Sequence, residues 1–205
     1  MDTEEIWRTI DEQRADLAEV LAGLTPAQWE TPSLCEGWTV RHVAAHLTHA
    51  TSGWARFGIE AVRSGFRFDA MMSRMVMSDR RTPDEIAAAL RAAVGVRRRP
   101  PGTVVADPLM DLLVHGQDIA IPLGITRPMP IPGAVVAAER LWGMSFPLNP
   151  RKRFADVAFT ATDAPFAVGT GRPVSGPIRD VVLVLSGREA GLAGLSGQAA
   201  ADAFG

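Results

Sequence analysis

The chain has 205 residues, 47% of them hydrophobic, which is enough for a buried core in one domain or in a domain with a small appendage. Its 21 basic and 23 acidic side chains give a formal net charge of -2, so the composition argues against nucleic acid and anionic membranes as partners. The acidic start and the lack of a long uncharged apolar run predict neither a secretory signal nor a membrane span, and a single cysteine fits a reducing compartment; we expect a cytoplasmic protein.

Amphipathic spacing and helix-end signals predict a helical domain over residues 1–148. Several helix starts are marked by Thr or Asp directly before a proline, followed by an acidic or amide side chain in the first turn. The expected helices cover residues 4–22, a short turn after Thr25, 40–64, a segment that begins after Thr82, 107–121 and 133–144. The stretch 65–81 holds four methionines, which we expect to fill an irregular part of the core rather than to line a cofactor site.

The pattern changes after Pro150, and residues 149–205 are predicted to form a small α+β region packed on the helical domain. Apolar residues alternate over 157–159 and 166–168, and Gly169-Thr170-Gly171 follows as a turn, so we expect a hairpin. Ser175-Gly176-Pro177 is the expected cap of a last helix over about 177–186. The Gly- and Ala-rich tail from Ala190 is predicted to be frayed.

The four histidines are distributed unevenly, because His42, His46 and His49 share one predicted helix and only His115 lies elsewhere. Asp111 precedes His115 by four residues, so both side chains fall on one helix face. Two facing helices could supply one histidine and an Asp–His pair, and three protein ligands with an open position are typical of catalytic zinc. From spacing alone, a core histidine and a surface aspartate remain the alternative. No nucleophile elbow, phosphate loop or CxxC pair is present in the sequence.

The run from Cys35 to Leu47, CEGWTVRHVAAHL, resembles the N-terminal motif of the mycothiol-dependent maleylpyruvate isomerase and DinB-like superfamily. The resemblance implies a four-helix bundle in which His46 binds a divalent metal. The segment 111–119, DLLVHGQDI, is similar to the second motif of that family, and this similarity implies that Asp111 and His115 complete the site. The isomerases commonly carry glutamate where this chain has Asp111. His42 is expected to be an outer group rather than a ligand.

Segments between Ala161 and Arg188 show a third similarity, to the small C-terminal part found in many actinobacterial relatives. Twenty arginines against one lysine indicate GC-rich codon usage, which suits a mycothiol-producing actinobacterium. The C-terminal region of this chain is short, so we expect it to lack groups that the isomerases use to bind thiol and substrate.

The resemblance implies an enzyme in which the metal, expected to be zinc, activates mycothiol for isomerisation or S-transfer on a small organic substrate. Three alternatives stay open: a hydrolase of the same fold with Asp111 or Asp118 as proton acceptor, a non-catalytic metal-binding stress-response module, and Cys35 as a nucleophile rather than a small buried side chain. The sequence names neither substrate nor metal, and it leaves a homodimer open.

Overall fold

The computed structural model describes residues 1–49, 68–99 and 102–204, and for residues 68–72 it describes the backbone alone. The chain forms two compact units, one of residues 7–127 and one of residues 1–6 together with 128–205. The first helix, α1 (Thr3–Ala22), has residues in both units. By contacts the division falls at Arg127/Pro128, whereas the sequence places a domain boundary at 148/149; that domain boundary stays a prediction.

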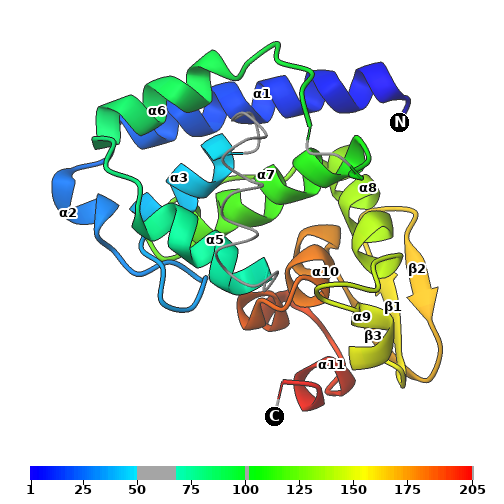
Figure 1. The fold of residues 1–205 in the computed structure, drawn as a ribbon. Coiled ribbons are helices and arrows are strands. Elements are labelled where there is room, and N and C mark those ends of the chain that lie inside the picture. The colour runs from blue at the N-terminus through cyan, green and yellow to red at the C-terminus, as the bar shows by residue number, and fades with distance from the viewer. Residues whose placement is uncertain (50–67, 100–101, 205) are drawn as a thin grey trace. The chain divides into compact units, whose positions relative to one another are not determined.

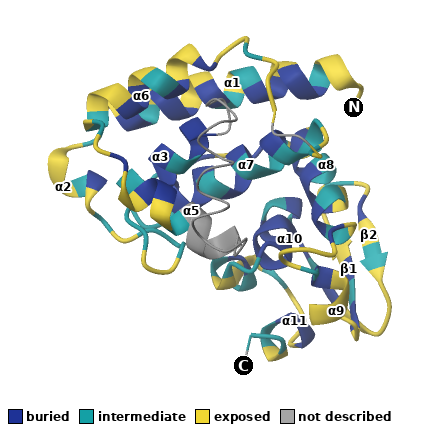
Figure 2. Ribbon diagram, viewed as in Figure 1, coloured by how far each residue is buried: buried dark blue, intermediate teal, exposed yellow. Residues whose placement is uncertain are grey.

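The unit of residues 7–127 is helical, and α3 (Val40–His49) is its central element. The other helices of this unit after α1 are α2 (Pro26–Trp29), α5 (Phe68–Met77), α6 (Pro83–Ala92) and α7 (Ala106–Ala120). Helix α3 contacts α5, α6 and α7, while α1 and α6 lie side by side, joined by a 2.7 Å ion pair between Arg91 and Glu19 (Figure 1). Dark blue bands along α3 and α7 in Figure 2 mark the apolar faces that these helices bury.

The predicted helix starts of this unit are confirmed where the signals are strongest. Thr25 and Thr82 each cap a helix with a complete capping box, to Gln28 and Glu85 respectively, and each is followed by proline. The methionine-rich stretch includes the helix α5. Of its methionines with described side chains, Met75 is buried as expected but Met77 is exposed. The expected helical residues 50–64 lie outside the described part of the chain.

Helix α7 also carries a glycine at a place where a side chain has no room. A Cβ on Gly116 would lie 2.6 Å from Nη1 of Arg127. The Arg127 guanidinium is buried there and pairs through Nε with Asp16 of α1 at 2.9 Å. Gly116 therefore lets a buried cation approach the helix backbone directly.

The other unit combines α8 (Ile131–Trp142), α9 (Pro150–Arg153) and α10 (Ile178–Leu185) with a three-stranded sheet in the order β2-β1-β3. The strands are β1 (Val157–Ala161), β2 (Ala167–Gly169) and β3 (Arg172–Gly176). The predicted hairpin is confirmed as the antiparallel pair β1–β2, in which Phe159 faces Val168. Strand β3 pairs parallel with β1 and was not predicted. The mainly helical class with a small α+β part is confirmed.

Two expectations for the C-terminal unit are wrong. Ser175 lies in β3 rather than in a helix cap, and the first amide of α10, at Ile178, donates instead to Asp163 Oδ1 at 2.7 Å. The tail is ordered rather than frayed: it forms a 3-10 helix, η1 (Glu189–Gly194), and α11 (Ala199–Asp202), and Ser196 bridges to Ser175. Within the described residues no helix has the length and apolar character needed to cross a bilayer.

Candidate metal centre

His46 and His115 face each other across the contact between α3 and α7. Val43 and Leu47 are buried on the inner side of α3, so His46 lies on the same side one turn after Val43. The two imidazole centroids are 4.7 Å apart with ring planes at 77°. The prediction that the two histidine-bearing helices are neighbours with inward-facing imidazoles is confirmed.

Asp111 brings a carboxylate to the same point, one turn before His115 on α7. Its Oδ2 lies 3.4 Å from His46 Nε2, and its Oδ1 lies 3.8 Å from His115 Nε2. The ligand atoms of the three residues all lie within 4.8 Å of one another. Both histidine side chains are 14% exposed and the Asp111 side chain is 36% exposed, so the cluster is partly open to solvent.

The distances separate this cluster from a neighbouring one formed by Cys35, His115 and Asp118. A tetrahedral zinc ion with bonds of about 2.0 to 2.2 Å keeps its ligand atoms roughly 3.3 to 3.6 Å apart. The 3.4 Å pair falls within that spacing and the 3.8 Å pair lies slightly beyond it, and both are too long for good hydrogen bonds. In the neighbouring cluster Asp118 Oδ2 is 2.7 Å from His115 Nδ1 and 3.1 Å from Cys35 Sγ, which are hydrogen-bond distances. The first cluster is therefore the candidate metal centre, and the second is a hydrogen-bonded group beside it.

The other two histidines are used structurally. His42 Nδ1 accepts from the Thr39 amide at 3.1 Å at the start of α3, and burial followed by the charge of Arg41 lowers the pKa of His42. His49 is buried, and its Nε2 is 3.0 Å from Asp79 Oδ2. Although burial acts in the opposite sense, hydrogen bonds from Arg81 and His49 hold the pKa of Asp79 well below its usual range. The structure therefore places neither histidine at the centre.

Sequence reasoning missed how closely residues 33–38, the loop between α2 and α3, surround the two histidines. Trp38 lies with its ring centroid 5.6 Å from that of His46, and Cys35 reaches Asp118 on the His115 side. The loop is closed on itself by the Ser33 amide, which donates to the Trp38 carbonyl at 2.9 Å. Cys35 is half-buried rather than the fully buried small side chain that we expected. The motif CEGW (residues 35–38) was part of the family resemblance, but its local sequence does not show which residues its side chains contact.

Two solved structures share the fold of this chain. They are the crystal structure of the mycothiol-dependent maleylpyruvate isomerase and that of its histidine-to-alanine mutant, with TM-scores of 0.63 and 0.62. Each is 14% identical, over 96% of this chain and 93% of the other. At this identity the likeness shows a common fold. A search of curated proteins gave no match.

The family model for the mycothiol maleylpyruvate isomerase N-terminal domain matches residues 10–99. Residues 10–99 are similar to this domain over slightly less than half of the chain. The mycothiol maleylpyruvate isomerase N-terminal domain thus includes His46, Trp38 and Cys35, whereas Asp111 and His115 follow after the matched segment. The structure brings these later residues to the domain's histidine through the packing of α7 on α3.

Proposed function

We propose that this chain is a metal-dependent enzyme of the mycothiol-dependent isomerase or S-transferase type, with His46, Asp111 and His115 as the ligands of one divalent metal. The observation that carries the proposal is the convergence of two imidazole nitrogens and a carboxylate within 4.8 Å in a chain that contains the family's N-terminal domain. A cytoplasmic location and a homodimer stay predictions.

The donor set fits zinc. Two imidazoles and one carboxylate are the protein ligands of known catalytic zinc sites, and three ligands leave a position for a small molecule. The partial exposure of Asp111 keeps the cluster accessible. When bound, the metal supplies acidity, because coordination lowers the pKa of a thiol enough to leave a thiolate at neutral pH.

The surrounding side chains suit a small conjugated substrate next to a thiol. The Trp38 ring beside His46 offers a flat apolar wall, which suits a planar unsaturated acid. In cis–trans isomerisation a thiolate adds to the activated double bond and the electron pair moves to the conjugated carbonyl. Rotation about the new single bond and departure of the thiolate restore the double bond, so the reaction consumes neither electrons nor protons. In S-transfer the thiolate stays attached, and the carbon next to the carbonyl takes from solvent a proton that replaces the one the thiol released.

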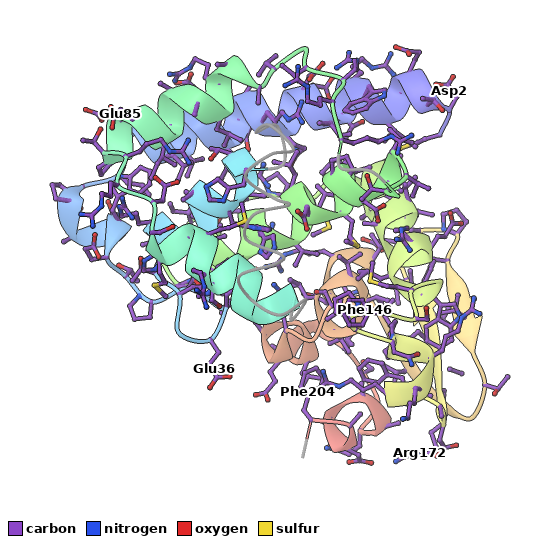
Figure 3. All side chains as sticks on the ribbon, in the orientation of Figure 1. Asp2, Glu36, Glu85, Phe146, Arg172 and Phe204 are labelled. Atoms are coloured by element: carbon purple, nitrogen blue, oxygen red, sulfur yellow. The ribbon has the colours of Figure 1, made fainter. Side chains whose placement is uncertain are left out.

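The test begins with metal analysis of protein made without a polyhistidine tag, because the tag itself binds metal. Zinc-loaded protein is then assayed with maleylpyruvate in the presence and absence of mycothiol. We expect one equivalent of metal and isomerisation only with the thiol. His46→Ala should lose both, while Glu36→Gln, which changes an exposed carboxylate on the neighbouring loop, should lose neither (Figure 3).

The remaining outcomes separate the alternatives. Metal binding with ester or amide hydrolysis that needs no thiol would favour a hydrolase of this fold. Metal binding without turnover and without calorimetric thiol binding would favour a non-catalytic metal-binding module. Protein that binds no divalent metal at stoichiometric level would refute the proposed centre.

A further inference from the structure

Asp118 is a fully buried carboxylate that contacts His115 at Nδ1, whereas His115 Nε2 faces Asp111 of the ligand cluster. It follows His115 by three residues on α7, and its side chain is 0% exposed. One oxygen, Oδ2, lies 2.7 Å from His115 Nδ1 and accepts a hydrogen bond from the Cys35 thiol at 3.1 Å. The backbone carbonyl of Asp118 accepts from the Leu34 amide at 3.3 Å, which ties α7 to the loop that carries Cys35.

The contacts of the Asp118 carboxylate indicate where the protons lie when it is ionised. An ionised carboxylate only accepts hydrogen bonds, and leaving it unsatisfied in the interior is costly. When Asp118 is ionised, as its hydrogen bond from the Cys35 thiol favours, the 2.7 Å contact places a hydrogen on His115 Nδ1. In a neutral imidazole this leaves the lone pair on Nε2, the nitrogen that faces Asp111.

His46 differs from His115 in this respect. Its Nδ1 is buried and has no hydrogen-bond partner among the residues that the structure describes. Within that part of the chain, only one of the two candidate imidazole ligands is oriented by a carboxylate. The two halves of the centre are thus supported unequally.

We propose that Asp118 is a positioning residue that holds His115 in the tautomer with hydrogen on Nδ1, and that the Cys35 thiol moderates this grip by sharing the same oxygen. The link to metal affinity rests on the proposed function, whereas the tautomer does not. Both groups hydrogen-bond to the same carboxylate oxygen. Removal of the thiol should therefore strengthen the hydrogen bond between Oδ2 and His115 Nδ1. This role differs from proton transfer to substrate. The Asp118 carboxylate has no exposed surface and lies on the Nδ1 side of His115, so a substrate at the ligand cluster would not reach it.

The first experiment measures the tautomer in metal-free protein by long-range proton–nitrogen NMR of labelled histidine, at about pH 8, where an ordinary histidine is neutral. We expect His115 to carry its hydrogen on Nδ1. Asp118→Asn should shift it towards Nε2, because the amide can donate to Nδ1; loss of the orienting carboxylate in a catalytic triad has a comparable effect. Asp107→Asn, the same change at the start of α7, should leave the His115 signals in place.

The second experiment measures zinc affinity by competition with a chromophoric chelator. Asp118→Asn should bind roughly 10- to 100-fold more weakly, the usual loss for groups that orient a ligand. Asp118→Glu should recover part of that loss, and Cys35→Ala should bind at least as tightly as the unaltered protein. Circular dichroism reports whether each variant is folded.

The outcomes distinguish the two proposals. Wild-type His115 with its hydrogen on Nε2 would overturn the positioning role even if Asp118→Asn fails to fold. Unchanged zinc affinity in folded Asp118→Asn would also overturn the positioning role. Weaker zinc binding in Cys35→Ala would overturn the moderating role of the thiol. If the wild-type protein shows the expected tautomer but binds no metal, the proposed function fails and the role of Asp118 towards His115 stands.

Discussion

Replacement of Asp111 by alanine tests whether this carboxylate binds the metal directly or through water. Its side chain is one methylene shorter than the glutamate common in the isomerases, a difference in reach of about 1.5 Å. Even so, its oxygens lie 3.4 and 3.8 Å from the two imidazole Nε2 atoms, close to the roughly 3.3 to 3.6 Å between ligands of a tetrahedral zinc ion. With an intervening water the oxygens would lie about 4 Å or more from those nitrogens. The packing of α7 on α3 thus makes up for the shorter side chain.

Direct binding predicts a large loss of affinity. Outer groups that act through another ligand typically cost about 10- to 100-fold when removed, so Asp111→Ala should exceed roughly 100-fold. Asp111→Asn keeps the shape but removes the charge and should fall between alanine and the wild type. Asp111→Glu should retain one equivalent of metal, because the added methylene restores the side chain of the isomerases.

Chelator competition on tag-free protein gives the affinities, and elemental analysis gives the stoichiometry. His49→Gln is the matched control, because it alters a buried histidine on α3 that pairs with Asp79 rather than with the centre. Unchanged affinity in Asp111→Ala would refute the reasoning from distances. A loss in His49→Gln as large as in Asp111→Ala, with the fold intact, would refute the choice of ligands.

Three further predictions concern stability, each measured by denaturant unfolding. Asp79→Asn should destabilise the protein at neutral pH. Because Arg81 depresses the pKa of Asp79 in the folded state, the contribution of the Asp79 charge to stability is present above about pH 4 and fades as pH falls below that value. The free energies of unfolding of the two proteins should then converge. Gly116→Ala should cost about 1 to 3 kcal/mol, because its Cβ would overlap the buried Arg127 guanidinium, and an unchanged midpoint would contradict that contact. Burial raises the pKa of Asp180 in the folded state, so the folded protein holds this proton more tightly than the unfolded chain does. Stability relative to Asp180→Asn should therefore decline as pH rises above about 4, and a difference independent of pH would count against this reasoning.

Helix boundaries were predictable because their signals lie within a few residues of one another. Thr82 and Glu85 form a capping box in the structure as their three-residue spacing indicates. Strand β3 was not predictable in this way, because its Val174 becomes a strand residue only by pairing with Phe159 of β1. The glycine-rich tail was misjudged for a related reason. A Cβ on Gly194 would lie 2.1 Å from Asp180 Oδ2, so that glycine permits close packing rather than fraying.

For the centre, the sequence alone determined which side chains are available and which share a helix face. The four-residue spacing of Asp111 and His115 and the resemblance around His46 were enough to nominate all three ligands. Only the packing of α3 on α7 decided that their Nε2 and carboxylate atoms converge. Other tertiary contacts decided the rest: the residues after α5 bring Asp79 to His49, and the loop before α3 brings Cys35 to Asp118 behind His115. Spacing along a helix determines the direction in which each side chain leaves that helix. Convergence of side chains from two helices depends also on the distance and angle between the helices, and these are determined by contacts between residues far apart in the chain.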